Sequence, residues 1–382
     1  MLSGLITSLF GGISVGSVLL IAALGLAIVF GLMGVINMAH GELMMMGAYT
    51  TFLVQNACKG TPFADLYIFP AIIAAFLVAG LLGFLLERTV VRHLYGRPLE
   101  TLLATWGVSL ILQQLVRSVS WQFMIGIGIF GGLYYGGNLL LSKGELTKFD
   151  WKKLLLTTVA GIASLVICNA LGDIFKLAIT QPWFGAQNVD VTAPSWLLGG
   201  LPIGEDQLPS TRIFIIALTA CCVAGVYWFL NKSMWGLRIR AVTQNREMSS
   251  CLGIPTDRVD ALTFALGSGL AGIAGVAVSL LGSVGPNTGT NYIIDTFMVV
   301  VVGGVGKLVG SIVAALVLGT TSYLIGSDSF APLLSWAPPL ASFFTFFSNS
   351  SMAKVMVFSA IFVFLQARPA GLFPQKGRTV EN

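Results

Sequence analysis

Charged residues are scarce in this chain and make up only 10% of its 382 positions, where soluble domains carry about 25%. Hydrophobic residues account for 55%, and the mean hydropathy is +0.87. This balance excludes a soluble enzyme and predicts an all-α polytopic integral membrane protein, formed as a single transmembrane domain over residues 1–382. Because one crossing takes about 20 apolar residues, we expect about ten transmembrane helices. The net charge of +5 then reflects basic loops, and we expect no nucleic-acid partner.

The side chains that build catalytic and metal sites are also few. There are two histidines, His40 and His93, and the five cysteines show no ligand spacing. No nucleophile–base pair stands out, so we expect neither an enzyme nor a metal or other cofactor. The segment GGVGK (303–307) resembles a phosphate loop only superficially, because Leu308 stands where that loop needs Ser or Thr. The N-terminus lacks the pattern of a removable signal peptide.

Lysine and arginine are absent from two long segments, 183–211 and 326–350. They gather instead in four others: 88–100, 143–153, 232–258 and the tail from Arg368 onward. The positive-inside rule keeps basic segments in the cytoplasm, so the two segments without basic residues are expected outside. We therefore place the C-terminus in the cytoplasm.

Two apolar stretches do not fit straight membrane helices. The stretch Val18–Val54 would be about 55 Å long as one helix, too long for one span, and its natural bend is INMAHGEL at 36–43. The stretch 292–325 turns at 303–307, and its first arm of about 11 apolar residues would reach only about 17 Å. We expect a re-entrant or broken helix pair there.

The bend at 36–43 carries three polar side chains in apolar surroundings, Asn37, His40 and Glu42. Polar and ionisable groups are costly inside lipid, which makes this group a functional candidate. The alternative is a plain helix–helix turn near the inner surface, in which Asn37 and His40 cap helix ends. The sequence favours neither interpretation.

A polar stripe follows Pro98 on an otherwise apolar helix. Its members recur every four residues and are Thr101, Thr105, Ser109 and Gln113, with Trp106 beside them. Hydroxyl and amide groups of this kind can hydrogen-bond packed membrane helices to one another. Alternatively, the stripe lines a path for a small neutral solute, in which Trp106 could sandwich a flat molecule.

The segment 231–258 is the longest clearly polar part of the chain. Within it, apolar residues recur with helical spacing at Leu237, Ala241, Met248 and Leu252. Only Asn245 interrupts this face, and Gly253 and Pro255 end the helix. We expect one short amphipathic helix. An apolar face outside the membrane needs a cover, which is either the lipid headgroups or a groove on a soluble partner.

Several strings resemble a known family of transporters. GLAIVFGLMGVINMAHGELMMMGAY, WGLRIRAVTQNREMSSCLGI and GGVGKLVGSIVAALVLG resemble the permeases of branched-chain amino-acid-type ATP-binding-cassette importers. LYGRPLETLLATWGVSLILQQLVR and QNVDVTAPSWLLGG resemble the urea-importer branch, in particular the first of its two permease subunits. The resemblance covers roughly 8–120 and 187–370. Residues 121–186 do not match and look like an inserted helix pair.

The resemblance implies a five-part importer in the inner membrane of a bacterial cell. A periplasmic binding protein would deliver urea. A second permease subunit would form the pathway together with this chain, and both would be surrounded by membrane lipid. Two ATPase subunits would bind the ATP. The expected substrate-pathway residues are Asn37, His40, Glu42, Thr105, Trp106, Ser109 and Gln113. The expected ATPase-coupling residues, in the cytoplasmic loop 231–258, are Arg238, Arg240, Ala241, Asn245, Arg246, Glu247 and Met248.

Three other functions stay open from the sequence. A branched-chain amino-acid permease of the same family would need countercharges or helix ends for its zwitterionic substrate, and the stripe offers neither at mid-depth. A passive channel for small solutes would need no docking helix. An integral-membrane enzyme lacks candidate catalytic groups.

The outer loop 183–210 is expected to be periplasmic and to receive the binding protein. It combines aromatic anchors with an acidic rim, a pattern that suits a transient interface: Trp183, Trp196, Asp190, Glu205 and Asp206. The alternative is a surface loop that packs only on its own chain.

Overall fold

The computed structural model describes residues 2–62, 64–120, 124–133, 157–164, 166, 183–184, 187–203, 206–327, 342 and 345–373. The chain divides into two compact units, one formed by Met1–Leu110 with Val189–Asn382 and the other by Ile111–Asn188. Residues 157–164 and 166 of the expected second span of the inserted pair are helical, while the rest of that span and Glu205 lie outside the described residues. Met124–Leu133 of the second unit is a short apolar helix.

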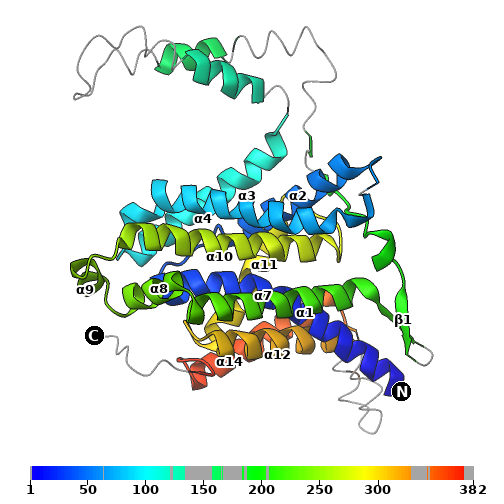
Figure 1. The fold of residues 1–382 in the computed structure, drawn as a ribbon. Helices are drawn as coiled ribbons and strands as arrows, with labels where there is room; N and C mark the ends of the chain where they lie inside the picture. Colours follow the sequence, from blue (N-terminus) through cyan, green and yellow to red (C-terminus); the bar gives the residue numbers. More distant parts are fainter. Residues whose placement is uncertain are drawn as a thin grey trace, which may run out of the picture. The chain divides into compact units, whose positions relative to one another are not determined.

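The protein is an all-α polytopic membrane protein, and its described residues include one short β-hairpin (Figure 1). The α-helices with described bounds are α1 (Leu2–Met33), α2 (His40–Cys58), α3 (Ile68–Thr89), α4 (Pro98–Ser118), α7 (Ser210–Lys232), α8 (Met234–Gln244), α9 (Arg246–Cys251), α10 (Thr256–Ser279), α11 (Thr288–Gly303), α12 (Leu308–Gly326) and α14 (Ser350–Ala367). Three short 3-10 helices are η1 (Ala64–Leu66), η2 (Val91–Leu94) and η3 (Ser195–Leu197). Among the described helices, six are long and apolar enough to cross a membrane: α1, α3, α4, α7, α10 and α12.

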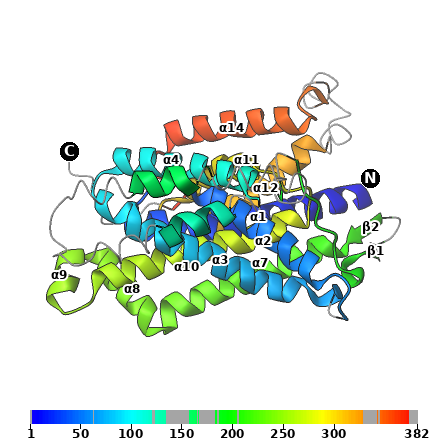
Figure 2. The same cartoon turned by 90° about the horizontal axis from the view of Figure 1, so that it is seen from above.

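Helices α1 and α10 form the centre of the first unit. The most apolar window of each is 83% buried, and α10 packs against α3, α2 and α1 (Figure 1 and Figure 2). Glycine makes this packing close, because a Cβ on Gly275 would clash with the carbonyl oxygen of Met44 in α2. A Cβ on Gly272 would clash in the same way with the Ala75 carbonyl of α3. Small residues therefore let three backbones approach closely, as expected for helices packed in lipid.

The chain breaks between α1 and α2, as the length of the apolar stretch predicted. Helix α1 ends at Met33, Gly34 takes a φ of 68°, and α2 begins at His40. A positive φ is readily reached by glycine because it has no Cβ. The two helices are thus separated by a short irregular segment, 34–39.

The pair α11 and α12 turns at 304–307, where the sequence predicted the pivot. Gly304 and Gly306 have φ values of 96° and 81° there. The first arm is longer than predicted, since α11 has 16 residues, about 24 Å of helix. The prediction counted only the apolar residues from 292 onward, whereas the helix begins earlier, with the polar residues from Thr288. Helix α11 is still shorter than a full membrane span.

The segment 189–209 belongs to the first unit and packs against its helices. Gln55 of α2 and Tyr67 both donate to the Thr192 carbonyl, at 2.9 and 2.7 Å. The segment continues into the hairpin of β1 (Gly200–Ile203) and β2 (Asp206–Pro209), which pair antiparallel. The Trp196 ring stacks on Phe69 with 6.2 Å between ring centroids and stays 46% exposed. Asp190 is exposed as well.

Candidate functional site

Helix α2 starts deep inside the first unit. The Nε2 atom of His40 lies 3.0 Å from the carbonyl oxygen of Ala22 in α1. Gly25 in α1 faces Gly267 across a contact too close for a Cβ on either residue. Gly267 lies about midway along α10 (Thr256–Ser279). The first turn of α2 is therefore level with the middle of the two central helices.

The broken segment before α2 carries buried polar atoms. Asn37 is 1% exposed, and its Oδ1 accepts from the backbone N of Ala39 at 3.0 Å. The side chain thus closes a local turn, while Ala39 is the N-cap of α2 and His40 its first helical residue. Among the described residues, Nδ2 of Asn37 and Nδ1 of His40 have no hydrogen-bond partner. Buried polar atoms usually have a partner, so such exceptions point to a place where function competes with packing.

Glu42 is the centre of this site. It is 1% exposed, and its Oε1 accepts from Ser109 Oγ of α4 at 3.2 Å and from Thr290 Oγ1 of α11 at 3.3 Å. A Cβ on Gly289 would lie 2.6 Å from the other carboxylate oxygen, so the carboxylate lies against the backbone of α11. Glu42 is in the first turn of α2, and Gly289 in the first turn of α11. Two helix N-termini, each with a partial positive charge, therefore favour a negative charge here.

The predicted polar stripe is the buried face of α4. Thr101, Thr105 and Ser109 are 2%, 0% and 6% exposed, whereas the opposite face exposes apolar residues, including 64% of Leu103. Thr105 Oγ1 accepts from the backbone N of Met38 at 3.1 Å, which ties the stripe to the α1–α2 break. The Ser109 hydroxyl donates to Glu42 of α2, whereas the Thr101 hydroxyl donates to the carbonyls of Leu94 and Arg97, just before α4.

One predicted pathway residue, Trp106, does not lie on this buried face. Trp106 is 51% exposed, on another face of α4 from Thr105 and Ser109. Gln113 lies one turn beyond Ser109 on the same helix, in the second unit. Thr290 belongs to the group, and sequence reasoning missed it. The polar run TGTN from Thr288, at the start of the short arm, could have indicated it.

The coupling segment forms two helices, and the prediction of one helix is wrong. Helix α8 ends at Gln244, and Asn245 has extended backbone dihedrals, φ −154° and ψ 104°. Its side chain accepts from the backbone N of Met248 at 2.9 Å and so caps α9. Asparagine is among the strongest N-cap residues, and this capping separates the two helices.

Three of the four residues of the predicted apolar face are exposed, while Ala241 is half-buried. Leu237, Met248 and Leu252 are 54%, 59% and 75% exposed. The opposite face is buried and holds the helices on the protein through Ile239, which is 4% exposed, and Val242. Arg240 and Glu247 are exposed, and Arg238 lies over the Trp235 ring, 4.9 Å from its centroid.

An ionic cluster connects α9 to α10. Arg246 Nη2 lies 2.8 Å from Asp260 Oδ2, and the Asp260 side chain is 7% exposed. Arg246 also lies 3.7 Å from Asp257, which forms an ion pair with Arg92 of η2. Its guanidinium group is 4.7 Å from the centroid of the Tyr95 ring.

The Tyr95 hydroxyl in turn donates to Glu87 of α3 at 3.2 Å. Burial raises the pKa of Tyr95, so its hydroxyl stays protonated and remains a donor. The cluster joins α3, α9 and α10, and it could not be predicted from the sequence because its members are far apart in the chain. Among the described residues, no group of three or more His, Cys, Asp or Glu side chains could hold a metal ion.

Comparisons with known proteins find similarity to permeases over most of the chain. Residues 8–365 match the family described as "Branched-chain amino acid transport system / permease component". The chain is 26% identical over 321 residues to the high-affinity branched-chain amino acid transport system permease protein LivH of Salmonella typhimurium, covering 83% of this chain and 84% of LivH. It is 26% identical over 326 residues to BraD of Pseudomonas aeruginosa, covering 84% and 86%. The ribose import permease protein RbsC of Escherichia coli is 28% identical over 194 residues, 47% of this chain and 53% of RbsC. No solved structure matches.

Proposed function

Because the chain belongs to the family of branched-chain amino acid transport system permease components, we propose that it is one of two permeases in an ATP-driven importer of urea. The family membership supports a transporter subunit without ATP chemistry of its own. The two strings at 94–117 and 187–200, which resemble the urea-importer branch, support the choice of urea. The importer lies in a bacterial inner membrane, with the C-terminus of this chain in the cytoplasm, as the basic residues predict.

The observation that carries the substrate proposal is the hydroxyl–carboxylate group at the α1–α2 break. Urea is flat and neutral, with N–H donors on two nitrogens and one acceptor oxygen. The Glu42 carboxylate can accept from two N–H groups, and the hydroxyls of Ser109 and Thr290, now bonded to it, can donate to the urea oxygen. Replacing water in this way offsets the cost of taking the solute out of solution.

The hydrogen bonds that close the site in this structure are the ones the solute replaces. Ser109 and Thr290 reach Glu42 from α4 and α11, so a small separation of these helices from α2 would open all three polar side chains at once. Hydrogen bonds to a charged group are worth about 1.5–3 kcal/mol each, and the bonds that urea forms offset those it replaces, which keeps the net binding of the solute weak enough for release.

Branched-chain amino acids are the second candidate substrate. The names of LivH and BraD favour them. The site also offers what a zwitterion needs, since the first turns of α2 and α11 meet there to face a carboxylate, and Glu42 could face an ammonium group. The polar stripe on α4, considered alone in the sequence, offered neither a helix N-terminus nor a countercharge.

We assign ATPase docking to the exposed face formed by Leu237, Met248 and Leu252. A force on α9 would reach α10 through the pair Arg246–Asp260. Helix α10 in turn contacts α2 where Gly275 meets Met44. Helix α10 therefore connects the coupling face with the helix that carries the polar site.

The loop 187–209, with Trp196 on its surface, is the proposed receptor for the binding protein.

Substrate competition tests the proposal directly. The complete importer, purified with its binding protein and reconstituted in liposomes, is given ATP and labelled urea, with leucine or thiourea as competitors. We expect ATP-dependent urea uptake that thiourea reduces and leucine does not. Uptake of labelled leucine without uptake of urea would instead establish the second candidate, and urea flux that continues without ATP would indicate a channel.

A further inference from the structure

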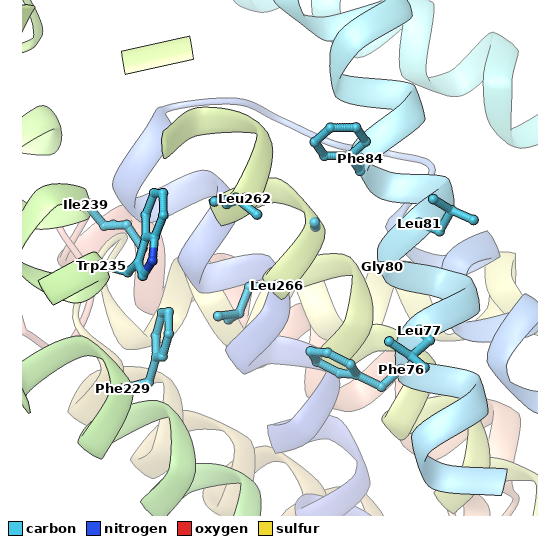
Figure 3. Close-up of a pocket in the computed structure, with 11 residues that line it drawn as sticks. Phe76, Leu77, Gly80, Leu81, Phe84, Phe229, Trp235, Ile239, Leu262 and Leu266 are labelled. Atoms are coloured by element: carbon cyan, nitrogen blue, oxygen red, sulfur yellow. The ribbon is translucent and has the colours of Figure 1, made fainter. Parts of the chain in front are cut away.

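An apolar groove opens between helices of the first unit. One wall is α3, with Phe76, Leu77 and Phe84, and the other wall is formed by Phe229 of α7 and Trp235 of α8 (Figure 3). Leu262 and Leu266 of α10 lie between the walls. The groove has a volume of about 470 Å³, within the range of ligand pockets of about 300–1,000 Å³. Its apolar lining suits a hydrocarbon chain.

The groove continues into a second cavity with a charged mouth. Phe84, Trp235 and Leu262 line both cavities, and the second is also lined by Arg88 at the end of α3 and by Arg258 in the first turn of α10. Both arginines are exposed, and among the described residues neither has an ion-pair partner. Asp257 lines this cavity too, but it is already paired with Arg92 and Arg246.

The two cavities thus form one site with an apolar part and a cationic part. Tryptophan at such a boundary is typical of the headgroup level of a membrane. Long arginine side chains reach from the apolar region toward headgroups, where they attract anionic lipids. A negatively charged phosphate would balance Arg88 and Arg258 while an acyl chain filled the groove beneath.

We propose that this groove binds one anionic phospholipid, with an acyl chain between α3 and α8 and its phosphate at Arg88 and Arg258. The charge of the mouth favours this occupant over a neutral lipid. The apolar walls favour it over a soluble anion. Because Trp235 belongs to α8, the lipid would also brace the helix that carries Leu237 of the exposed docking face.

The test measures the lipid retained by the purified complex. Membranes containing equal amounts of phosphatidylglycerol and phosphatidylcholine are used for purification, and native mass spectrometry counts each lipid on the intact importer. We expect phosphatidylglycerol to be enriched, and Arg88→Gln or Arg258→Gln to reduce that enrichment about fivefold each. The control is Arg97→Gln, an exposed arginine that pairs with Glu100 outside the groove. It should leave enrichment unchanged.

A second variant separates the apolar part from the charged part. Ala265→Leu would fill the groove and should reduce retention of both lipids, with the melting temperature of the complex used to exclude misfolding. Enrichment that is equal in the wild type and in both arginine variants would overturn the proposal. So would a cross-link from a cysteine introduced at Leu81, on the groove wall, to the second permease, because the groove would then be covered by protein.

Discussion

The central helices α1 and α10 differ from the outer helix α4 in how much of their surface is buried and in which side chains they turn inward. The apolar windows of α1 and α10 are 83% buried, against 22% for α4. The central pair places glycines against neighbouring backbones, whereas α4 turns polar side chains inward and apolar ones outward. The candidate site lies where the two kinds of helix meet, at the start of α2. Close packing there holds a buried carboxylate beside a helix that is less firmly enclosed and therefore better able to move.

The largest expected effect comes from filling a central glycine contact. Gly275→Val places a side chain against the Met44 carbonyl and should lower the free energy of unfolding by about 3 kcal/mol. The matched control is Gly225→Val on the outer helix α7, where an added Cβ meets nothing within 4 Å. Thermal melting of purified chains checks this, and equal melting temperatures for the two variants would remove the distinction between central and outer helices.

The next largest effect concerns the docking face. Met248→Asp puts a charge in the middle of an exposed apolar face and should reduce both ATPase co-purification and ATP-driven uptake to background, because a buried unpaired charge is costly. Met248→Leu keeps the face apolar and should behave like the wild type. A complex that assembles normally with Asp at this position would show that the ATPase docks elsewhere.

Breaking the ionic cluster should have an intermediate effect. Arg246→Ala leaves the buried Asp260 without its partner at 2.8 Å and should cost about 2 kcal/mol of stability. This is less than the roughly 3–5 kcal/mol of fully buried pairs, because the Arg246 side chain is 42% exposed. The additional change Asp260→Asn should restore stability.

The control for Arg246→Ala is Arg97→Ala, which breaks an exposed pair and should cost about 0.3 kcal/mol. Denaturant titration measures all three proteins. If the double variant is no more stable than Arg246→Ala, the ion pair is not the cause of the loss.

The sequence predicted the parts of the site that depend on spacing along one element. Apolar length placed the α1–α2 break, and a four-residue repeat identified the buried face of α4. Helical spacing selected Leu237 and Met248, which are both exposed but lie on two separate helices. Contacts between distant elements could not be predicted in this way. Thr290 reaches Glu42 across 248 positions, and no single segment carries that information. Asn245 was read as an interruption of a face because its capping bond depends on backbone geometry, not on periodicity.

A smaller effect distinguishes the two faces of α4. Ser109→Ala removes one hydroxyl bonded to Glu42 and should slow urea uptake per assembled complex about tenfold, or about 1.4 kcal/mol in the transport barrier. Leu103→Ala, on the exposed face, should leave uptake within about twofold of the wild type, a change of only about 0.4 kcal/mol in that barrier. A stripe used only for packing would give the reverse result for Ser109→Ala: lower melting temperature with uptake per complex preserved.

The most direct measurement is urea uptake per assembled importer carrying Glu42→Gln, in liposomes with ATP and binding protein. Glutamine keeps the shape of the side chain and an oxygen that can accept from Ser109 and Thr290, so the melting temperature should change by only a few degrees. Loss of the carboxylate at the junction of α2 and α11 should nevertheless reduce uptake at least tenfold, about 1.4 kcal/mol or more. Uptake equal to that of the wild type, in a complex of equal stability, would contradict the assignment of this group to the solute path.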